Sequence, residues 1–383
     1  MGQEGGRAAQ PSRCDGRGRM TPLPRWVDIG LLPLINLTLA LAVAGLVVAL
    51  IGEDPLAALS VMAQGAFVYP GSLGYTLYYT TNFIFTGLAV SVAFHAALFN
   101  IGGEGQATLG GLGLALVVLA VGPVLPGPLT ILLAIGGAAL FGAAWAFVPG
   151  WLQAYRGSHI VITTIMFNFI AAGLMVWLLS GPLMGSGQGS PQTATFPESA
   201  WLPQMHEVLG WFGAEVARSP LNLAFPLALV ACLGVWVLIW RTKFGYALRA
   251  LGHSEPAAAY AGIPVRRLIV AAMLISGALA GCMALNEILG VQHRLLLNFS
   301  AGYGFTGIAV ALMGRNHPVG IVLASLLFGA LFQGGAELDF EFQSITRELV
   351  LVIQGLIILF SGALAHMFTP WLARSWMRRR AVV

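Results

Sequence analysis

Two apolar runs on either side of one polar cluster decide the fold of this chain. Residues 74–122 read GYTLYYTTNFIFTGLAVSVAFHAALFNIGGEGQATLGGLGLALVVLAVG, and the polar cluster within them is LFNIGGEGQ at 98–106. A helix needs about 20 predominantly apolar residues to cross a bilayer, and the run at 74–98 meets that length. The stretch therefore predicts two membrane-spanning helices joined by a short polar segment.

The composition of the whole chain points the same way. Of its 383 residues, 57% are hydrophobic and 9% are charged, and the mean hydropathy is +0.82, whereas soluble domains carry about 25% charged residues. So few charges cannot build a water-facing surface, which excludes a set of soluble domains. Cys14, Cys232 and Cys282 lack the spacing of a disulfide framework or a metal site. We expect an all-α fold, a polytopic membrane helix bundle of about ten transmembrane helices.

Apolar runs of suitable length occur along most of the chain. We predict ten spans, at residues 30–51, 74–98, 106–122, 127–149, 160–180, 223–240, 266–287, 303–314, 319–336 and 348–368. The third and eighth are short, and broken or re-entrant helices are tolerated at membrane depth only where protein or water covers the backbone. The sequence leaves open whether these two spans cross the membrane fully.

The chain divides into a transmembrane domain and two polar tails. Residues 1–25 are polar and rich in Gly and Arg, a composition typical of disorder, and Met20 opens a segment that resembles a start of its own, so we expect it to be the initiator. Residues 26–370 form the predicted transmembrane domain, with a hydrophilic outer loop at 181–222 and a cytoplasmic loop at 241–265.

Basic residues predict the orientation of the spans. If the N-terminus is cytoplasmic and the ten spans alternate, the cytoplasmic segments, including a basic tail at 371–383, hold 16 of the 19 basic residues. Most acidic residues then fall in the outer loops. This asymmetry follows the positive-inside rule, so both termini are predicted to be cytoplasmic. Orientation accounts for the net charge of +4 better than nucleic-acid binding does, and we expect no nucleic-acid partner.

The sequence lacks the motifs of the common enzyme classes. Its one Lys, Lys243, does not stand in the Gly-x-x-x-x-Gly-Lys-Ser/Thr run of a nucleotide-binding P-loop. No His-x-x-x-His or Gly-x-Ser-x-Gly run occurs, and the seven His are spread from His95 to His366. We therefore expect no catalytic residue, no metal site and no directly bound cofactor.

Polar side chains at the polar cluster are the first candidates for function. An ionisable group inside a span costs about 2.5–3.5 kcal/mol on insertion scales, so Glu104 needs a partner, a water-filled cavity or a neutral state. The glycines around it let the backbone bend and let helices approach. A broken helix here would aim Asn100, Glu104 and Gln106 at a ligand or at a neighbouring helix. The alternative is a tight cytoplasmic turn in which Glu104 caps the helix that follows.

Further polar residues lie deeper in the spans. Asn168 follows Thr164 by one helical turn in the fifth predicted span, and it either lines a pathway or makes an interhelical hydrogen bond, which contributes about 0.6 kcal/mol on average. Glu287 and Gln354 are similar single polar residues in apolar surroundings.

A weak internal echo accompanies these polar positions. FTGLAV at 85–90 and FTGIAV at 305–310 differ at one position. Internal repeats are common in transporters, although so short a match in an apolar sequence also arises by chance.

The cytoplasmic loop at 241–265 contains a predicted helix of its own. Ser254 is a suitable N-cap, Pro256 stands early in the helix and Gly262 follows its end. We predict a short exposed helix at about 255–261. It is either a solvated surface helix or a projection that docks another protein.

Four motifs in this order resemble those of one family. They are FNIGGEGQ at 99–106, TTIMFNFIA at 163–171, FGYALRALGHSEPAAAYAGI at 244–263 and YGFTGIAVALMGRNHP at 303–318. They resemble the inner-membrane permease subunits of bacterial ABC importers for nucleosides and simple sugars, in the group of ribose and branched-chain amino acid permeases. The likeness spans about 75–368, and the long outer loop resembles the larger of the two permeases usual in nucleoside systems.

The resemblance implies a type II-like ABC importer permease in the bacterial inner membrane, surrounded by membrane lipid. A second permease subunit, usually a different chain, would complete one pathway. ATPase subunits would bind ATP below it, and a periplasmic or lipoprotein substrate-binding protein would deliver the substrate. The resemblance also implies that the ATPase grips the loop helix, through the coupling residues Gly252, Glu255, Pro256, Ala259, Tyr260 and Gly262.

Two hypotheses follow for what the chain carries and what drives it. The leading one is an importer for a nucleoside, or else a simple sugar, whose pathway needs amide or carboxylate groups for ribose hydroxyls and an aromatic ring for the base. The candidates are Phe99, Asn100, Glu104, Gln106 and Asn168. The alternative is an ion-gradient-driven secondary transporter in which Glu104 or Glu287 is the coupling carboxylate.

One departure from the family pattern stands just before the fifth span. An Asn-Glu pair is common there in the family, and Ser158-His159 occupies the position in this chain. The change removes an acid near the inner face and weakens the transfer of any role at that position.

Overall fold

The computed structural model describes residues 32–356, apart from residues 188, 215, 343, 347 and 348, together with residue 359. These residues belong to two compact units, a larger one at Val48–Gln354 and a smaller one that includes residues 32–47. The predicted tails at 1–25 and 371–383, the initiator at Met20 and most of the tenth span lie outside the described residues.

The described residues form helices and no β-strand, which confirms the all-α prediction. The longer helices are α1 (Leu32–Ile51), α3 (Ser72–Phe94), α4 (Gly103–Val121), α5 (Gly127–Arg156), α6 (Ile160–Leu179), α8 (Ala224–Arg241), α11 (Val265–Cys282) and α13 (Pro318–Glu341). The shorter ones are α2 (Pro55–Phe67), η2 (Glu198–Ala200), α7 (Met205–Gly210), α9 (Lys243–His253), α10 (Glu255–Tyr260), η3 (Leu285–Gln292) and α12 (Tyr303–Met313). Within the described part of the chain, seven helices are long and apolar enough to cross a membrane.

Each of the first nine predicted spans coincides with helix, although several bounds differ. The third, α4, is an unbroken helix of 19 residues, whereas α12 has only 11. α5 continues through Pro149 to Arg156, beyond its predicted end. α2 was not predicted, because its 13 residues are too few to span a bilayer. The sequence nevertheless contains a signal for its start, the pair Asp54-Pro55. In the structure the Asp54 carboxylate accepts the Leu56 N–H (2.8 Å), and Pro55 is the first residue of the helix.

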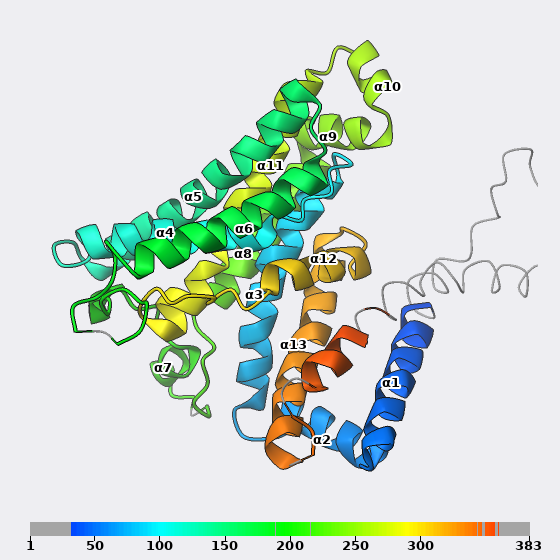
Figure 1. Ribbon diagram of the computed structural model, residues 1–383, viewed down its shortest axis with the longest axis vertical. Helices are drawn as coiled ribbons and strands as arrows, with labels where there is room; N and C mark the ends of the chain where they lie inside the picture. The colour runs from blue at the N-terminus through cyan, green and yellow to red at the C-terminus, as the bar shows by residue number, and fades with distance from the viewer. Residues whose placement is uncertain are drawn as a thin grey trace, which may run out of the picture. The chain divides into compact units, whose positions relative to one another are not determined.

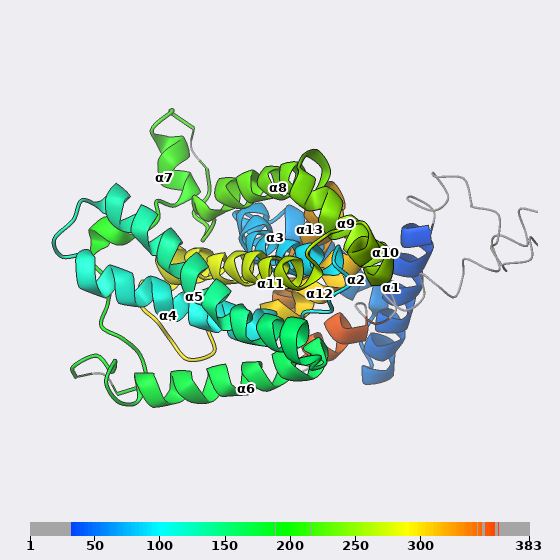
Figure 2. The same ribbon diagram turned by 90° about the horizontal axis from the view of Figure 1, so that it is seen from above.

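α4, α5 and α11 pack against one another through glycines, and α6 lies beside α4 and α5 (Figures 1 and 2). A Cβ on Gly142 of α5 would overlap the carbonyl oxygen of Gly277 of α11. A Cβ on Gly110 of α4 would overlap the Cα of Gly281 of α11. Small residues at such crossings let helix backbones touch, which gives membrane helices their van der Waals contact.

α3, α12 and α13 form the neighbouring group of helices (Figure 1). The two copies of the sequence echo lie on α3 and α12 and face each other there. A Cβ on Gly307 would lie 2.5 Å from the Cβ of Thr86, so glycine is what allows the close approach.

The larger unit has two ends, named here the loop end and the α10 end, and different segments of the chain pack at each. At the loop end, the 181–222 segment reaches the turn between α4 and α5, where Gly122 lies against Pro197, and the start of α3, where Gly71 lies against the Arg218 carbonyl. At the α10 end, α9 and α10 adjoin the end of α3 and the start of α11.

The 293–302 segment runs as non-helical chain alongside α4, from the loop end to the start of α12 (Figure 1). At its beginning, the His293 carbonyl accepts the N–H of Phe196 (2.8 Å). Further along, the Phe299 ring fills the space beside Gly111 of α4. The segment ends at the start of α12, beside the first turn of α4.

Candidate functional site

A buried amide network closes the start of α4. Asn100 and Gln106 are each 1% exposed. The Asn100 Nδ2 donates to Gln106 Oε1 (3.0 Å) and to Ser276 Oγ of α11 (2.9 Å), and Gln106 Nε2 donates back to Asn100 Oδ1 (3.1 Å). The Gly102 N–H also donates to Asn100 Oδ1 (2.9 Å). The structure thus brings these two predicted pathway residues together, but their polar atoms bind each other and α11.

Glu104 points from the same turn toward α12. Its Oε1 accepts the Ser300 hydroxyl (2.6 Å) and the Gly302 N–H (2.9 Å), and its Oε2 accepts the Gly304 N–H (2.9 Å). Gly302, the N-cap of α12, has φ 80°, a left-handed conformation that suits glycine. A carboxylate at a helix N-terminus satisfies otherwise unpaired amides and is favoured by the helix dipole. Glu104 therefore caps a helix, as one interpretation required, but the helix is α12 rather than the one it begins.

Asn168 of α6 makes contact with the same turn from its other side. Its Nδ2 donates to the Ile101 carbonyl (3.0 Å) and its Oδ1 accepts the Gly105 N–H (2.9 Å). These are the interhelical hydrogen bonds of the simpler interpretation. Phe99 lies edge-on to Phe94, with ring centroids 5.2 Å apart, so it belongs to the apolar contacts of this turn.

A second polar network in the interior was largely missed by sequence reasoning. Asn82 Nδ2 of α3 donates to Glu287 Oε1 (2.6 Å), Asn286 Nδ2 donates to Asn82 Oδ1 (2.9 Å), and Asn222 Nδ2 donates to Asn286 Oδ1 (3.0 Å). All four side chains are at most 3% exposed. Glu287 was a candidate, whereas the three asparagines carried no signal beyond standing near or within apolar runs. η3 is a π-helix, a local widening often found at functional sites.

The predicted helix of the 241–265 loop is present at the α10 end. Ser254 caps α10, since its Oγ accepts the Ala257 N–H (3.4 Å). Thr242 caps the preceding α9 in the same way, through the Gly245 N–H (3.1 Å). α9 was not predicted as a separate helix, although its cap residue is visible in the sequence.

α10 presents its side chains to the surroundings while α9 is anchored. Tyr260 is 97% exposed, and Ala258 is the one buried residue of α10. The other predicted coupling residues on this surface are also exposed, namely Glu255, Pro256, Ala259 and Gly262. Gly252 differs from them, because a Cβ there would overlap the carbonyl oxygen of His95 at the end of α3.

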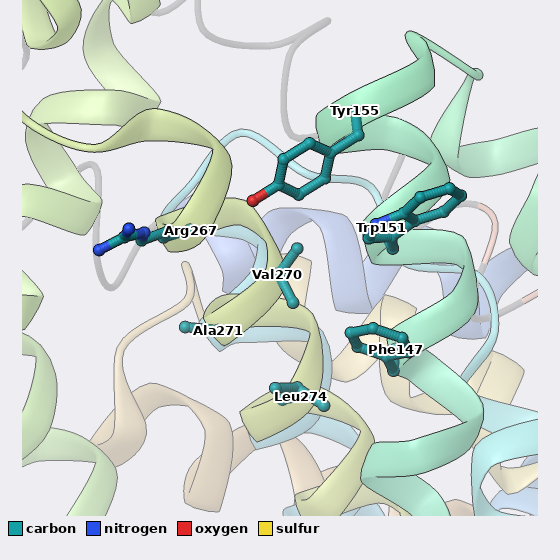
Figure 3. Close-up of a pocket in the computed structure, with 7 residues that line it drawn as sticks. All are labelled: Phe147, Trp151, Tyr155, Arg267, Val270, Ala271 and Leu274. Carbon is teal, nitrogen blue, oxygen red and sulfur yellow. The ribbon is translucent and has the colours of Figure 1, made fainter.

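An apolar groove of about 370 Å³ lies between α5 and α11 near the α10 end. Figure 3 shows aromatic side chains of α5 on one side and aliphatic side chains of α11 on the other, with Arg267 beside them: Phe147, Trp151, Tyr155, Val270, Ala271 and Leu274. So apolar a lining suits an acyl chain better than a ligand with many hydroxyls. Among the described residues, no three His, Cys, Asp or Glu side chains gather as a metal site would require.

The 181–222 segment packs against the end of η3 through His293. The Trp201 indole stacks on the His293 imidazole, with ring centroids 3.8 Å apart and an interplanar angle of 14°. Burial lowers the pKa of His293 from its ordinary value, and the Arg294 charge lowers it further. The structure therefore favours a neutral imidazole at this position.

We expect this contact to weaken in acid. Because the folded-state pKa of His293 is below the unfolded value, the folded chain binds fewer protons, and stability is full above about pH 6.5 and falls as pH drops below it. Hydrogen exchange of residues 196–202, measured between pH 5 and 8 and corrected for intrinsic rates, should show this loss of protection. His293→Phe keeps a stacked ring and should flatten the profile, and an unchanged profile in that variant would contradict the assignment.

The chain is similar to permease components of transport systems over most of its length. A family model described as the permease component of the branched-chain amino acid transport system matches residues 72–362. The glucose ABC transporter permease protein TsgB13 of Haloferax volcanii is 34% identical over 338 residues, covering 88% of each chain. The guanosine ABC transporter permease protein NupP of Bacillus subtilis is 36% identical over 335 residues, 86% of this chain and 92% of the relative. The nucleoside ABC transporter permease protein NupB of Lactococcus lactis is 30% identical, covering 86% and 90%.

Proposed function

The chain belongs to the family of permease components of the branched-chain amino acid transport system, and from that premise we propose that it is the membrane-spanning subunit of an ATP-driven importer for a nucleoside or a simple sugar. The substrate class rests on the relatives, whose names specify glucose, guanosine and nucleosides. These relatives are permeases of ABC transporters, which favours ATP as the energy source over an ion gradient. The protein acts as a permease rather than as an enzyme.

The observation that carries this proposal is the exposed helix α10 on an anchored base. Most residues of α10 are exposed, and only Ala258 is buried. The preceding helix α9 is packed against the end of α3, because Gly252 contacts the His95 carbonyl. A helix built this way suits the docking of a partner whose movements must reach the spans. In the proposal, an ATPase subunit holds ATP and contacts Glu255, Pro256, Ala259, Tyr260 and Gly262.

The other partners follow from the two ends of the larger unit. We place the α10 end in the cytoplasm, because the basic residues Arg156, Arg241 and Arg266 lie there and positive loops stay inside. A substrate-binding protein then docks at the loop end, a second permease subunit completes the pathway, and a lipid acyl chain occupies the groove of Figure 3. Phe99, Asn100, Glu104, Gln106 and Asn168 remain our proposed contributors to the pathway, through rearrangement of the networks described above.

Replacement of the docking surface tests the proposal. Tyr260→Ala and Gly262→Ala should each reduce uptake and the amount of ATPase that copurifies in mild detergent, because the first removes a side chain that is 97% exposed and the second strains a residue with φ 77°. Trp211→Ala, at an exposed position in the outer loop (73%), is the control and should leave ATPase recovery unchanged. Recovery of the wild-type chain without any ATPase, or full coupling in both variants, would refute the assignment.

A further inference from the structure

A second cavity, of about 460 Å³, opens at the loop end between α3 and α13. It differs in chemistry from the apolar groove of Figure 3, because three tyrosines and three polar side chains line it: Tyr69, Tyr75, Tyr79, Ser72, Gln333 and Glu337. No sequence motif groups these residues, since 69–79 and 333–337 are far apart in the chain. The cavity adjoins the outer loop, because the neighbouring Gly71 and Gly74 lie against Arg218 and Ser219.

One hydroxyl in this cavity has no partner. Ser72 is 2% exposed, and its Oγ makes no hydrogen bond with any described residue. Native proteins seldom leave a buried hydroxyl unsatisfied unless water, an ion or a ligand serves it. Since Ser72 lines the cavity, a ligand there can supply the missing partner.

Facing groups provide an amide and a carboxylate. Gln333 is 6% exposed, and its Nε2 donates to Glu337 Oε1 (2.9 Å), which holds both side chains in a fixed orientation. Among the residues that the structure describes, no lysine, arginine or histidine lines the cavity. An anionic ligand would therefore meet a carboxylate without compensation, whereas a neutral ligand with several hydroxyls would find both donors and acceptors.

A row of aromatic rings leads from the exposed side of the cavity toward the interior. Tyr75 is 42% exposed, and Tyr79 contacts Phe332 and Tyr303 with ring centroids 5.9 and 6.4 Å apart. Tyr303 is the first residue of α12 and follows Gly302, whose amide Glu104 binds. Aromatic faces of this kind stack on sugar or base rings, and this row joins the cavity to the Glu104 contact.

We propose that the cavity between α3 and α13 is an outer binding site for a neutral, hydroxyl-bearing ring compound, a sugar or a nucleoside. This inference rests on the proposed importer function and adds a location and a charge requirement to it. The ring stacks on Tyr75 and Tyr79, and its hydroxyls bond to Ser72, Gln333 and Glu337. A phosphorylated nucleoside is excluded by charge.

Direct binding to the purified full chain in lipid nanodiscs tests the site without the delivery protein. The probes are glucose, guanosine and guanosine 5′-monophosphate, followed by saturation-transfer NMR. We expect a signal from glucose or guanosine, which distinguishes a sugar from a nucleoside site, and none from the monophosphate. Ser72→Ala should raise Kd by about threefold to tenfold, the range expected for one lost hydrogen bond, without lowering thermal stability, because the hydroxyl has no partner to lose.

A matched control separates the site from the surface around it. Ser60→Ala changes an exposed serine of α2 that lies outside the cavity lining. Its hydroxyl accepts one hydrogen bond, from Gln64 Nε2, and the substitution should leave Kd unchanged. Unaltered binding in both Ser72→Ala and Tyr75→Ala, or no binding of either neutral probe to the wild-type chain, would overturn the site. The importer function is judged separately, by uptake and by recovery of the ATPase, so its failure would be seen independently.

Discussion

Gly142→Val is expected to destabilise the packing of α5 against α11 strongly. The new side chain would overlap the Gly277 carbonyl oxygen and crowd Gly281, so α5 and α11 would have to separate along a contact that α4 also shares. Overpacking of a core costs about 1–3 kcal/mol, and the upper end applies here because the obstacle is backbone, which cannot turn away. Size-exclusion chromatography after mild solubilisation should show aggregated or absent protein.

The control for this change stands on the same helix. A Cβ on Gly136 of α5 meets nothing within 4 Å, so Gly136→Val should leave folding unaffected and should yield a monodisperse peak. If Gly142→Val also gives a monodisperse peak with an unchanged melting temperature, the close approach of α5 and α11 is wrong.

Glu104→Leu is expected to release the start of α12 and to abolish uptake. Three donors, the Ser300 hydroxyl and the amides of Gly302 and Gly304, would lose their acceptor together. A buried donor left without a partner costs about 1–3 kcal/mol, so the total loss is about 3 kcal/mol or more. Hydrogen–deuterium exchange should show much faster exchange at Gly302 and Gly304, with little change in α5.

A neighbouring substitution checks that the effect comes from this carboxylate. The Thr108 hydroxyl bonds only to the Glu104 carbonyl within α4 (2.8 Å), so Thr108→Val should keep both exchange rates and uptake near the wild-type values. Wild-type protection at Gly302 in Glu104→Leu would show that α12 does not depend on this contact.

The sequence predicts the spans well because crossing a bilayer requires only length and low polarity, properties that each run carries locally. The cap of α10 was predictable for the same reason, since Ser254 and Pro256 act within one turn. α2 was missed because it is too short to be a span, and the π-helical turn of η3 has no simple composition signal. Both α2 and η3 required the structure.

The contacts of the candidate site join residues that are far apart in the chain, so the sequence alone does not predict them. Asn100 and Gln106 were predicted to point at a ligand or at a neighbouring helix, and in this conformation they bind each other and Ser276 of α11. The contact with a substrate stays a prediction. Gly103 and Gly105 of the polar cluster were correctly interpreted as points of close approach. Gly105 lies against Asn168 of α6, and the partner of Gly103, Gly304 of α12, lies about 200 residues further along the chain. The cavity between α3 and α13 depends on contacts of the same long range.

The 293–302 segment also constrains how the protein is made. Non-helical backbone cannot face lipid, so this piece of chain has no stable place in the bilayer by itself and must settle against surfaces that already exist. Synthesis from the N-terminus supplies them in the required order, since α4 with Glu104 and Gly111 and the 181–222 segment with Phe196 are translated first. Packing of this segment is therefore a late event in biogenesis, and chains halted before residue 293 should insert their earlier helices yet leave α4 uncovered beside Gly111.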